Sequence, residues 1–371
     1  MTLRSHITGW GKYVPPNVLT NDDLTHMVDT SDEWIRTRTG IEERRIADDD
    51  ETTSSMAIQA AQEALEVADL KPSDLDLIVV ATVTPDHPFP ATACLVQDTL
   101  GARGAAAFDI SAGCTGFIYA LTLAHHTLQS GAYENALVIG AETLSRITDW
   151  NDRSTCVLFG DGAGAVILQA DEAEGGVLST TLGTDGSGAR LLYVPAGGSQ
   201  IPSSHESVAE RQHYLRMRGR EVFRFAARIM PTATRDVLEK ADLTLEDLKL
   251  IIPHQANQRI IDSSAKLLDL PSETIFSNLS AYGNTSAASI PIALCEAVEE
   301  GRIQRDDLVV CVGFGAGLTW GATAIRWSTP RPEAPPSSVE KFWHSLRYRY
   351  AAARSLLRRF VRWLLSLGVN E

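Results

Sequence analysis

The chain has 371 residues, of which 44% are hydrophobic, enough for one large core or two fused ones. Its formal net charge of −14 argues against nonspecific binding to nucleic acid. The five cysteines form no CxxC pair, so the sequence predicts neither a disulfide framework nor a Cys-based zinc site, and reduced thiols are typical of the cytoplasm. The N-terminus shows no signal-peptide-like stretch and no run of about 18 uncharged apolar residues occurs, so we expect a cytoplasmic protein without a membrane span.

An internal repeat organises the chain. Residues 68–80 and 241–253 are identical at seven of thirteen positions, at an offset of 173. In each copy a helical stretch precedes the match (56–67 and 222–240), and a buried strand follows it. Such a repeat predicts two α/β halves related by a pseudo-twofold axis, although a duplication without a shared site stays open.

Three continuous apolar runs support this α/β reading. They span residues 137–140, 164–168 and 308–312, and runs of this kind are typical of strands covered on both faces of a sheet. We place the first half at residues 1–172 and the second half at residues 173–328.

The most informative residue of the first half is Cys114. An apolar run (105–110) precedes it and a helical pattern (117–128) follows, which predicts a strand, a tight turn and a helix with the thiol at the turn. A thiol at a helix N-terminus is expected to have a lowered pKa because the peptide dipoles favour its thiolate. The arrangement is that of a nucleophile elbow with cysteine as the nucleophile.

The second half contains a matching turn. Residues 109–112 resemble residues 278–281, and the first segment leads to Cys114 while the second leads to Asn284. The two residues therefore occupy equivalent elbows, and we expect both to face one central site. His254 follows the apolar end of the second repeat copy, at the end of a predicted strand. A buried structural imidazole is the alternative for His254.

These segments resemble the β-ketoacyl-[acyl carrier protein] synthase III family of thiolase-like condensing enzymes, over about residues 3 to 327. The matching motifs are Thr30–Ile35 with Arg38–Ile41, Ser111–Phe117, His254–Asn257, Gly283–Ser286 and Gly313–Gly321. The resemblance implies duplicated α/β halves in a layered αβαβα core. Chalcone-synthase-like enzymes also use a Cys-His-Asn set and are the nearest rival.

The resemblance implies a decarboxylative Claisen condensation between an acyl-CoA primer and malonyl-acyl carrier protein, initiating fatty-acid synthesis. Cys114 would hold the acyl group, and His254 with Asn284 would stabilise the enolate formed when malonate loses CO2. The backbone N–H groups of Cys114, Gly315 and Ala316 would form the oxyanion hole. Coenzyme A thioesters would be substrates, and no metal or redox cofactor is implied.

Further residues match positions that the family uses for its partners. Those for coenzyme A or its pantetheine arm are Trp34, Arg38, Arg153 and Asn257. Arg220, Arg224 and Arg228 recur at helical spacing as a basic stripe, which Arg259 extends. On an acidic protein such a stripe predicts docking of an acidic partner, and the resemblance implies that this partner is the acyl carrier protein. The alternatives are purely structural roles: a core aromatic for Trp34 and a solvated helix face for the arginines. Phe89 matches a residue that family dimers insert into the neighbour's acyl pocket, so a homodimer is expected.

The resemblance stops near Trp327. Residues 329–339 have the composition of a Pro/Ser-rich linker, and residues 340–371 predict a basic amphipathic helix with seven basic and two acidic residues. Its apolar positions follow a spacing of three and four: Trp343, Leu346, Tyr350, Ala353, Leu357, Phe360, Leu364 and Leu367. A membrane surface, a partner protein, the chain's own acidic surface and a second copy of the helix stay open as its contact.

Two functional alternatives stay open at this point. One is a condensing enzyme of secondary metabolism with a different acyl donor or acceptor. The other is a catalytically silent scaffold tethered through its C-terminal helix, against which the intact Cys-His-Asn set argues.

Overall fold

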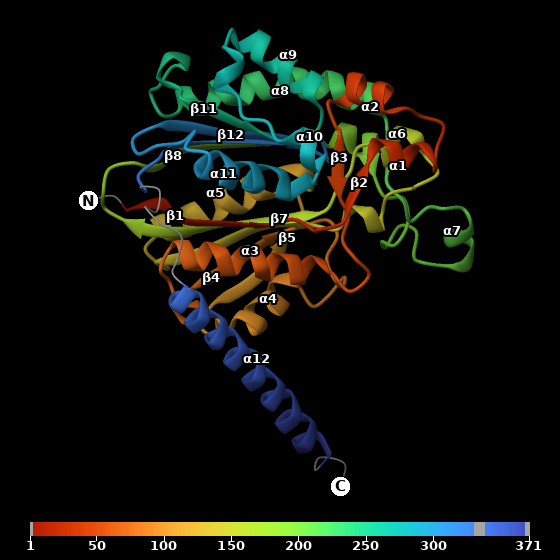
Figure 1. Cartoon of the computed structure of the whole chain (residues 1–371). Coiled ribbons are helices and arrows are strands. Elements are labelled where there is room, and N and C mark those ends of the chain that lie inside the picture. Colours follow the sequence, from red (N-terminus) through yellow and green to blue (C-terminus); the bar gives the residue numbers. More distant parts are fainter. Residues whose placement is uncertain (1–2, 330–337, 368–371) are drawn as a thin grey trace.

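The computed structural model describes residues 3–329 and 338–367, and it contains two central β-sheets (Figure 1). The first has strand order β1-β7-β6-β4-β5 and consists of β1 (Arg4–Tyr13), β4 (Leu77–Ala81), β5 (Ala106–Ile110), β6 (Asn135–Glu142) and β7 (Gly162–Asp171). The second has strand order β11-β12-β13-β8 and consists of β8 (Gly176–Thr184), β11 (Leu250–Pro253), β12 (Leu308–Gly315) and β13 (Thr319–Arg326). Strand β4 pairs in parallel with β5 and β6, and β11 pairs in parallel with β12. The remaining pairs in these sheets are antiparallel.

Helices fill three layers around the two sheets. Between the sheets lie α5 (Gly116–Gln129) and α11 (Ser289–Glu299), whose residues are mostly buried because both of their sides face a sheet. Helices α3 (Thr53–Val67) and α4 (Thr92–Leu100) cover the outer face of the first sheet. Helices α8 (Gly219–Glu239) and α9 (Gln258–Leu268) cover the outer face of the second. The predicted αβαβα core is thereby confirmed.

The sequence repeat has a structural counterpart. Helix α3 leads through η1 (Pro72–Asp74) into β4, and α8 leads through η5 (Leu245–Asp247) into β11. Asp69 and Asp242, at equivalent positions, both adopt left-handed backbone conformations, with φ of 51° and 55°. Aspartate tolerates this region better than most residues, so the repeated Ala-Asp-Leu segment ends each helix in the same way.

Short elements form the rim of the molecule near the ends of the strands. The helices of this group are α1 (Asn21–Thr25), α2 (Asp32–Thr39), α6 (Arg153–Cys156), α7 (His205–Ala209) and α10 (Leu279–Tyr282). The strands are β2 (Val18–Thr20), β3 (Glu43–Arg45), β9 (Leu192–Tyr193) and β10 (Arg216–Met217). The 3-10 turns are η2 (Gly113–Thr115), η3 (Leu144–Arg146), η4 (Gly186–Leu191), η6 (Ser272–Thr274) and η7 (Ser286–Ala288).

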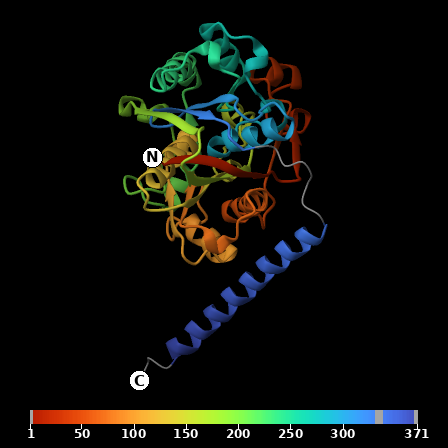
Figure 2. The same cartoon turned by 90° about the vertical axis from the view of Figure 1, so that its left-hand side faces the viewer.

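The C-terminal helix α12 (Ser338–Leu367) packs against α4 and then continues beyond the body of the molecule (Figures 1 and 2). Asp98 of α4 accepts hydrogen bonds from Ser355 Oγ and from Arg359 Nη2, the latter at 3.0 Å. The predicted helix is thus confirmed over its described residues, whereas most of the predicted linker (330–337) and residues 368–371 lie outside them. Within the described helices, none has the length and apolar character needed to cross a membrane.

Candidate active site

Cys114 sits at the turn between β5 and α5, as the sequence predicts. Gly113 adopts a φ of 56°, which glycine reaches without steric cost, and this lets the chain turn sharply before Cys114. The turn η2 contains Cys114, and α5 begins two residues later. The thiol is therefore held beside the N-terminus of a buried helix.

The second elbow carries Asn284, which lies just before η7 and α11, whereas Cys114 lies inside the turn η2 of the first elbow. The backbone is fixed by hydrogen bonds from Asn284 N to Leu158 O (2.8 Å) and from Gly160 N to Asn284 O (3.1 Å). Its side-chain Oδ1 accepts from Ser286 N at 2.9 Å. This contact orients the amide so that its NH2 group is left to donate to a ligand.

His254 directly follows β11 and is almost fully buried. Its Nδ1 lies 2.7 Å from Ser289 Oγ, and that oxygen also accepts from Gln255 N at 3.4 Å. The serine hydroxyl can therefore donate to Nδ1, which places the imidazole hydrogen on Nε2. Among the described residues Nε2 has no hydrogen-bond partner. Burial lowers the pKa of His254 to about 3, so the ring is a neutral donor.

One cavity of about 280 Å³ joins these side chains. Of the predicted site residues, its walls include Trp34, Arg38, Cys114, His254, Asn257, Asn284 and Gly315. Apolar side chains complete the walls, among them Phe159, Val222, Phe223, Ile260 and Phe314. A small, largely apolar cavity with a few convergent polar groups is the usual form of a ligand site.

The loop after β12 approaches the cysteine turn at backbone distance. A Cβ on Gly315 would lie 2.7 Å from Cys114 N, and a Cβ on Gly113 would lie 2.9 Å from Ala316 N. Only glycine allows such contact at these two positions. The three backbones predicted to form the oxyanion hole therefore lie side by side.

The prediction of a lowered Cys114 pKa is wrong. Burial raises the pKa of this thiol to about 12, and the nearby carboxyl of Glu142 adds to the increase. A hydrogen bond with the Ser286 side chain acts in the opposite direction but is the smaller effect. Desolvation of the buried thiol thus outweighs the groups that favour the thiolate, and the resting residue is a neutral thiol.

Glu142 was missed by the sequence reasoning. It ends β6, is completely buried, and its Oε1 accepts from Ser286 Oγ at 3.0 Å. Its Oε2 accepts from Thr82, Val83 and Thr84 at 2.6–3.1 Å. Burial raises the pKa of Glu142 to about 7. The carboxyl therefore connects the strand ends of the first sheet to Ser286, which contacts both catalytic elbows.

Three of the four predicted coenzyme A residues, Trp34, Arg38 and Asn257, line the cavity. The guanidinium of Arg153 lies 4.3 Å from the ring centroid of Trp34, a cation–π contact. Arg153 lies outside the cavity wall but stacks on Trp34, which forms part of that wall. Asn257 Nδ2 donates to Arg38 O at 3.1 Å and thereby joins α2 to the start of α9.

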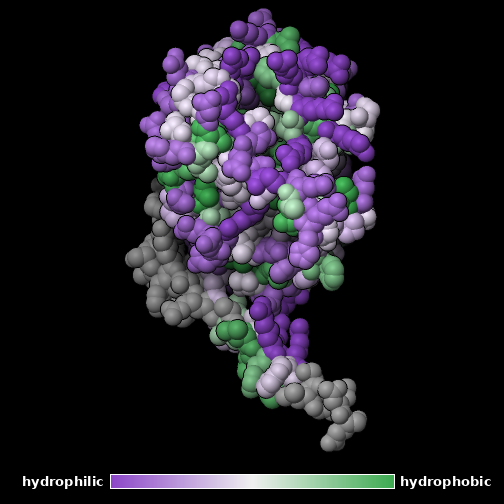
Figure 3. All heavy atoms as spheres, turned by 90° about the vertical axis from the view of Figure 1, so that its right-hand side faces the viewer, coloured by the Kyte–Doolittle hydropathy of each residue, from purple (hydrophilic) through white to green (hydrophobic). Residues whose placement is uncertain are grey.

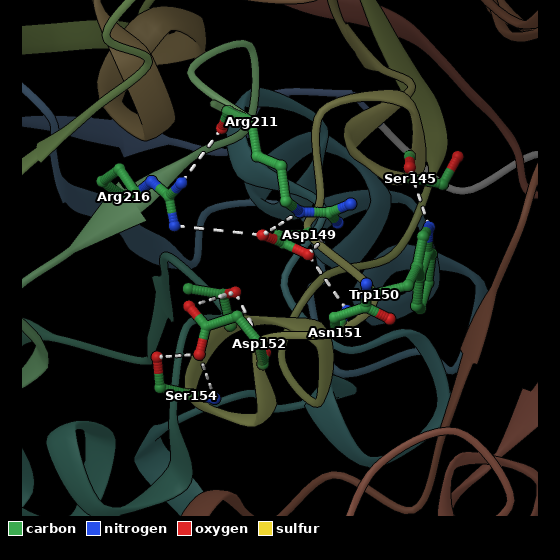
Figure 4. Close-up of polar contacts among 9 residues, drawn as sticks. Ser145, Asp149, Trp150, Asn151, Asp152, Ser154, Arg211 and Arg216 are labelled. Carbon is green, nitrogen blue, oxygen red and sulfur yellow. Dashed lines mark hydrogen bonds and ion pairs between the residues drawn. The ribbon is translucent and has the colours of Figure 1, made fainter. Parts of the chain in front are cut away.

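An ionic contact between the buried Asp149 and two partly exposed arginines precedes the helix that carries Arg153 (Figure 4). Asp149 accepts from Arg211, and Arg216 approaches it at 3.9 Å, so the segment around α7 and β10 is held against the start of α6. Asp152 caps α6 by accepting from Ser154 N at 2.9 Å. These contacts fix the short helix from which Arg153 projects.

The predicted carrier-protein residues lie outside the cavity. Arg220, Arg224 and Arg228 are exposed along α8, and Arg259 is exposed on the neighbouring α9. Arg259 stacks over Phe223, one of the cavity residues, with its guanidinium 5.4 Å from the ring centroid. The basic surface therefore borders the site.

Phe89 lies in the loop between β4 and α4 and is 85% exposed, so its side chain does not enter the cavity of its own chain. Over residues 3–329 and 338–367, no group of His, Cys, Asp or Glu side chains is arranged to hold a metal ion.

The duplicated α/β fold, with a cysteine elbow facing a histidine and an asparagine, defines a thiolase-like condensing enzyme. Family models described as 3-oxoacyl-[acyl-carrier-protein (ACP)] synthase III and its C-terminal part match residues 108–186 and 238–327. The beta-ketoacyl-[acyl-carrier-protein] synthase III of Caldanaerobacter subterraneus is 57% identical over 326 residues, which cover 88% of this chain and 98% of that protein. The enzyme of that name from Symbiobacterium thermophilum is 58% identical over 321 residues, 86% of this chain and 97% of its own length.

Solved structures agree with this assignment. The crystal structure of 3-oxoacyl-[acyl-carrier-protein] synthase III from Aquifex aeolicus has a TM-score of 0.81 at 53% identity, and the match covers 87% of this chain and 100% of that one. The priming β-ketosynthase of the R1128 polyketide pathway has a TM-score of 0.83 at 36% identity and covers 89% of this chain and 98% of its own. The chain therefore belongs to the 3-oxoacyl-[acyl-carrier-protein] synthase III family, a family of acyltransferases. Helix α12 lies beyond residue 327, where the family model ends.

Proposed function

We propose that this chain condenses an acyl-CoA primer with malonyl-acyl carrier protein and so initiates fatty-acid synthesis. The observation that carries the proposal is the single cavity onto which Cys114, His254 and Asn284 converge beside the Gly315 backbone. The identities of 57% and 58% to synthases III over almost their whole length support the same activity.

In the first half-reaction the sulfur of Cys114 attacks the thioester carbonyl. A C–S bond to the enzyme forms, the C–S bond to coenzyme A breaks, and the thiol proton of Cys114 leaves with the coenzyme A thiolate. The backbone N–H groups of Cys114 and of the Gly315–Ala316 turn stabilise the oxyanion. A neutral thiol with a pKa of about 12 makes this proton transfer part of the reaction, because little thiolate exists beforehand.

In the second half-reaction malonyl-acyl carrier protein loses CO2, and the electron pair of the broken C–C bond becomes an enolate. His254 Nε2 and the Asn284 amide donate to the enolate oxygen, which fits the orphaned Nε2 and the fixed amide. The carbanion then attacks the acyl carbon of the acyl-enzyme: a C–C bond forms, the C–S bond to Cys114 breaks, and the released Cys114 thiolate takes a proton from solvent. These steps need no metal or redox cofactor, because the thioesters and the released CO2 supply the chemistry.

We further propose that the exposed arginines on α8 and α9 dock the acidic carrier protein, and that Trp34, Arg38, Arg153 and Asn257 hold coenzyme A. Phe89, exposed on its loop, would reach the acyl pocket of a second copy in a cytoplasmic homodimer. The complete Cys-His-Asn set in one cavity argues against a silent scaffold.

The test is the intact mass of the protein after incubation with a panel of acyl-CoA thioesters, with Cys114→Ala beside the wild type. We expect a gain of one acyl group that the variant does not show, followed by its loss when malonyl-acyl carrier protein is added. If no acyl-CoA or acyl-carrier-protein donor loads the wild type, the proposed activity is wrong.

A further inference from the structure

Helix α12 presents two different faces. The face toward the body includes Ala351, Ser355 and Arg359: Ala351 packs at Gly101, and the other two bind Asp98. The opposite face exposes large apolar side chains, which are between 43% and 67% accessible: Tyr350, Leu356, Leu357, Phe360, Val361, Trp363 and Leu364. We call these seven residues the apolar stripe. Figure 3 shows green apolar atoms and purple hydrophilic atoms on opposite sides of the projecting helix.

A cluster of cations lies beside the stripe. A cavity of about 200 Å³ between α12 and the body is lined by Lys71 and Arg103 from the body and by Arg354 and Arg358 from the helix. No acidic residue lines this cavity, and none of the four cations forms an ion pair within the described part of the chain. The chain has a net charge of −14, so this cluster is a positively charged region on an otherwise acidic protein.

The cations occupy a defined position relative to the stripe. At 100° per residue, Arg354 and Arg358 fall between the docked face and the stripe, and Arg359 falls near the other edge. Charged groups are therefore placed at the border between apolar and polar surface. A helix lying in a bilayer interface has this arrangement, with apolar residues among the acyl chains and cations at the level of the phosphates.

We propose that α12 and the adjoining cation cluster bind the surface of an anionic phospholipid membrane. The apolar stripe inserts among the acyl chains, and Lys71, Arg103, Arg354 and Arg358 contact lipid phosphates. The positive charge of the cation cluster favours an anionic membrane as the binding partner, because each basic residue near an anionic leaflet strengthens membrane binding.

A second copy of α12 fits this surface poorly. Pairing two stripes would bring Arg354 and Arg358 of one helix near arginines of the other, and residues 341–367 contain no acidic side chain to offset them. The body stays on the far side of the helix, since the contacts to Asp98 and Gly101 are on the face opposite the stripe. The contacts that hold α12 to the body can therefore persist when the stripe lies in a membrane.

The experiment is co-sedimentation of the full chain with vesicles of phosphatidylcholine alone and with vesicles that also contain phosphatidylglycerol. We expect binding to the anionic vesicles, weakened by salt, and little binding to the neutral ones. Leu357→Glu with Phe360→Glu should reduce partitioning at least about tenfold, since each change removes apolar burial and adds repulsion. The matched control is Val208→Glu with Leu267→Glu, two equally exposed apolar residues on α7 and α9.

The cation cluster has its own test. Arg354→Gln with Arg358→Gln should weaken binding to anionic vesicles about tenfold or more, whereas Arg190→Gln with Arg305→Gln, exposed elsewhere, should leave it unchanged. Far-UV circular dichroism and thermal unfolding check that every variant is folded. The proposal is overturned if the wild type binds neither kind of vesicle, or if the stripe variant binds as the wild type does. It is also overturned if the stripe mediates only protein self-association, seen by light scattering.

Discussion

Glu142 offers the sharpest test of the electrostatics of the site. The perturbation is Glu142→Gln, which keeps the shape of the side chain but removes its ability to ionise. Burial raises the pKa of this carboxyl to about 7 from an ordinary value of 4.5. A carboxyl whose folded-state pKa is raised stabilises the fold while it is protonated. That stability is present below the unfolded-state pKa and is lost as the pH rises from about 4.5 through about 7.

The size of the effect follows from the pKa difference. A shift of about 2.5 units corresponds to ~3 kcal/mol, so ionisation in the folded state costs the wild type about that much by pH 8. Glutamine carries no such cost. Between pH 5 and pH 8, the free energy of unfolding of Glu142→Gln should therefore rise relative to that of the wild type by ~3 kcal/mol. For a chain of this length that is a relative Tm change of about 4 °C.

The assay is thermal unfolding of both proteins at a fixed concentration over this pH range. Glu134→Gln, which changes an exposed glutamate just before β6, is the matched control and should show a constant Tm difference from the wild type. A constant difference for Glu142→Gln as well would refute the reasoning, because it would mean that Glu142 does not titrate in this window. Acyl loading of Cys114 should also slow in Glu142→Gln, since the one amide oxygen is needed by the donors of Thr82, Val83 and Thr84, which turns the NH2 group toward Ser286 in place of its acceptor.

Three further variants test the roles proposed for the site. His254→Gln should still accept an acyl group on Cys114 by intact mass, but condensation with malonyl-acyl carrier protein should fall by about 10²–10³; equal loss of both steps would contradict the assignment. Arg220→Glu with Arg224→Glu should raise the KM for malonyl-acyl carrier protein about tenfold and weaken its salt dependence, with loading from acyl-CoA unchanged. Trp34→Ala should raise the KM for acyl-CoA while leaving kcat nearly the same, and an unchanged KM would favour a purely structural tryptophan.

Much of the fold could be predicted because burial leaves a pattern in the sequence. The apolar runs at 137–140, 164–168 and 308–312 all became buried strands, namely parts of β6, β7 and β12. The repeat predicted two related halves, and the elbows at Cys114 and Asn284 followed from it. Local sequence was sufficient here because strand, turn and helix are each specified by neighbouring residues.

The electrostatics could not be predicted in the same way. Glu142 and Ser286 are 144 residues apart and meet only when the two elbows close on one another. The pKa of Cys114 depends on how completely the folded chain excludes water from the thiol, and the helix dipole alone gave the wrong direction. Long-range proximity and depth of burial are properties of the tertiary structure and leave no periodic signal.

The duplication explains how two halves with the same architecture supply different catalytic groups. At the repeat offset of 173, His254 corresponds to Ala81 and Ser289 corresponds to Gly116. In the first half these positions pack tightly, since a Cβ on Gly116 would lie 3.0 Å from the Ala81 Cβ, and this close fit sets the start of α5 behind Cys114. In the second half the same pair is polar, and the Ser289 hydroxyl fixes the His254 ring at 2.7 Å. The backbone geometry is shared by both copies, so the difference in side chains makes one half present the nucleophile and the other present the donors.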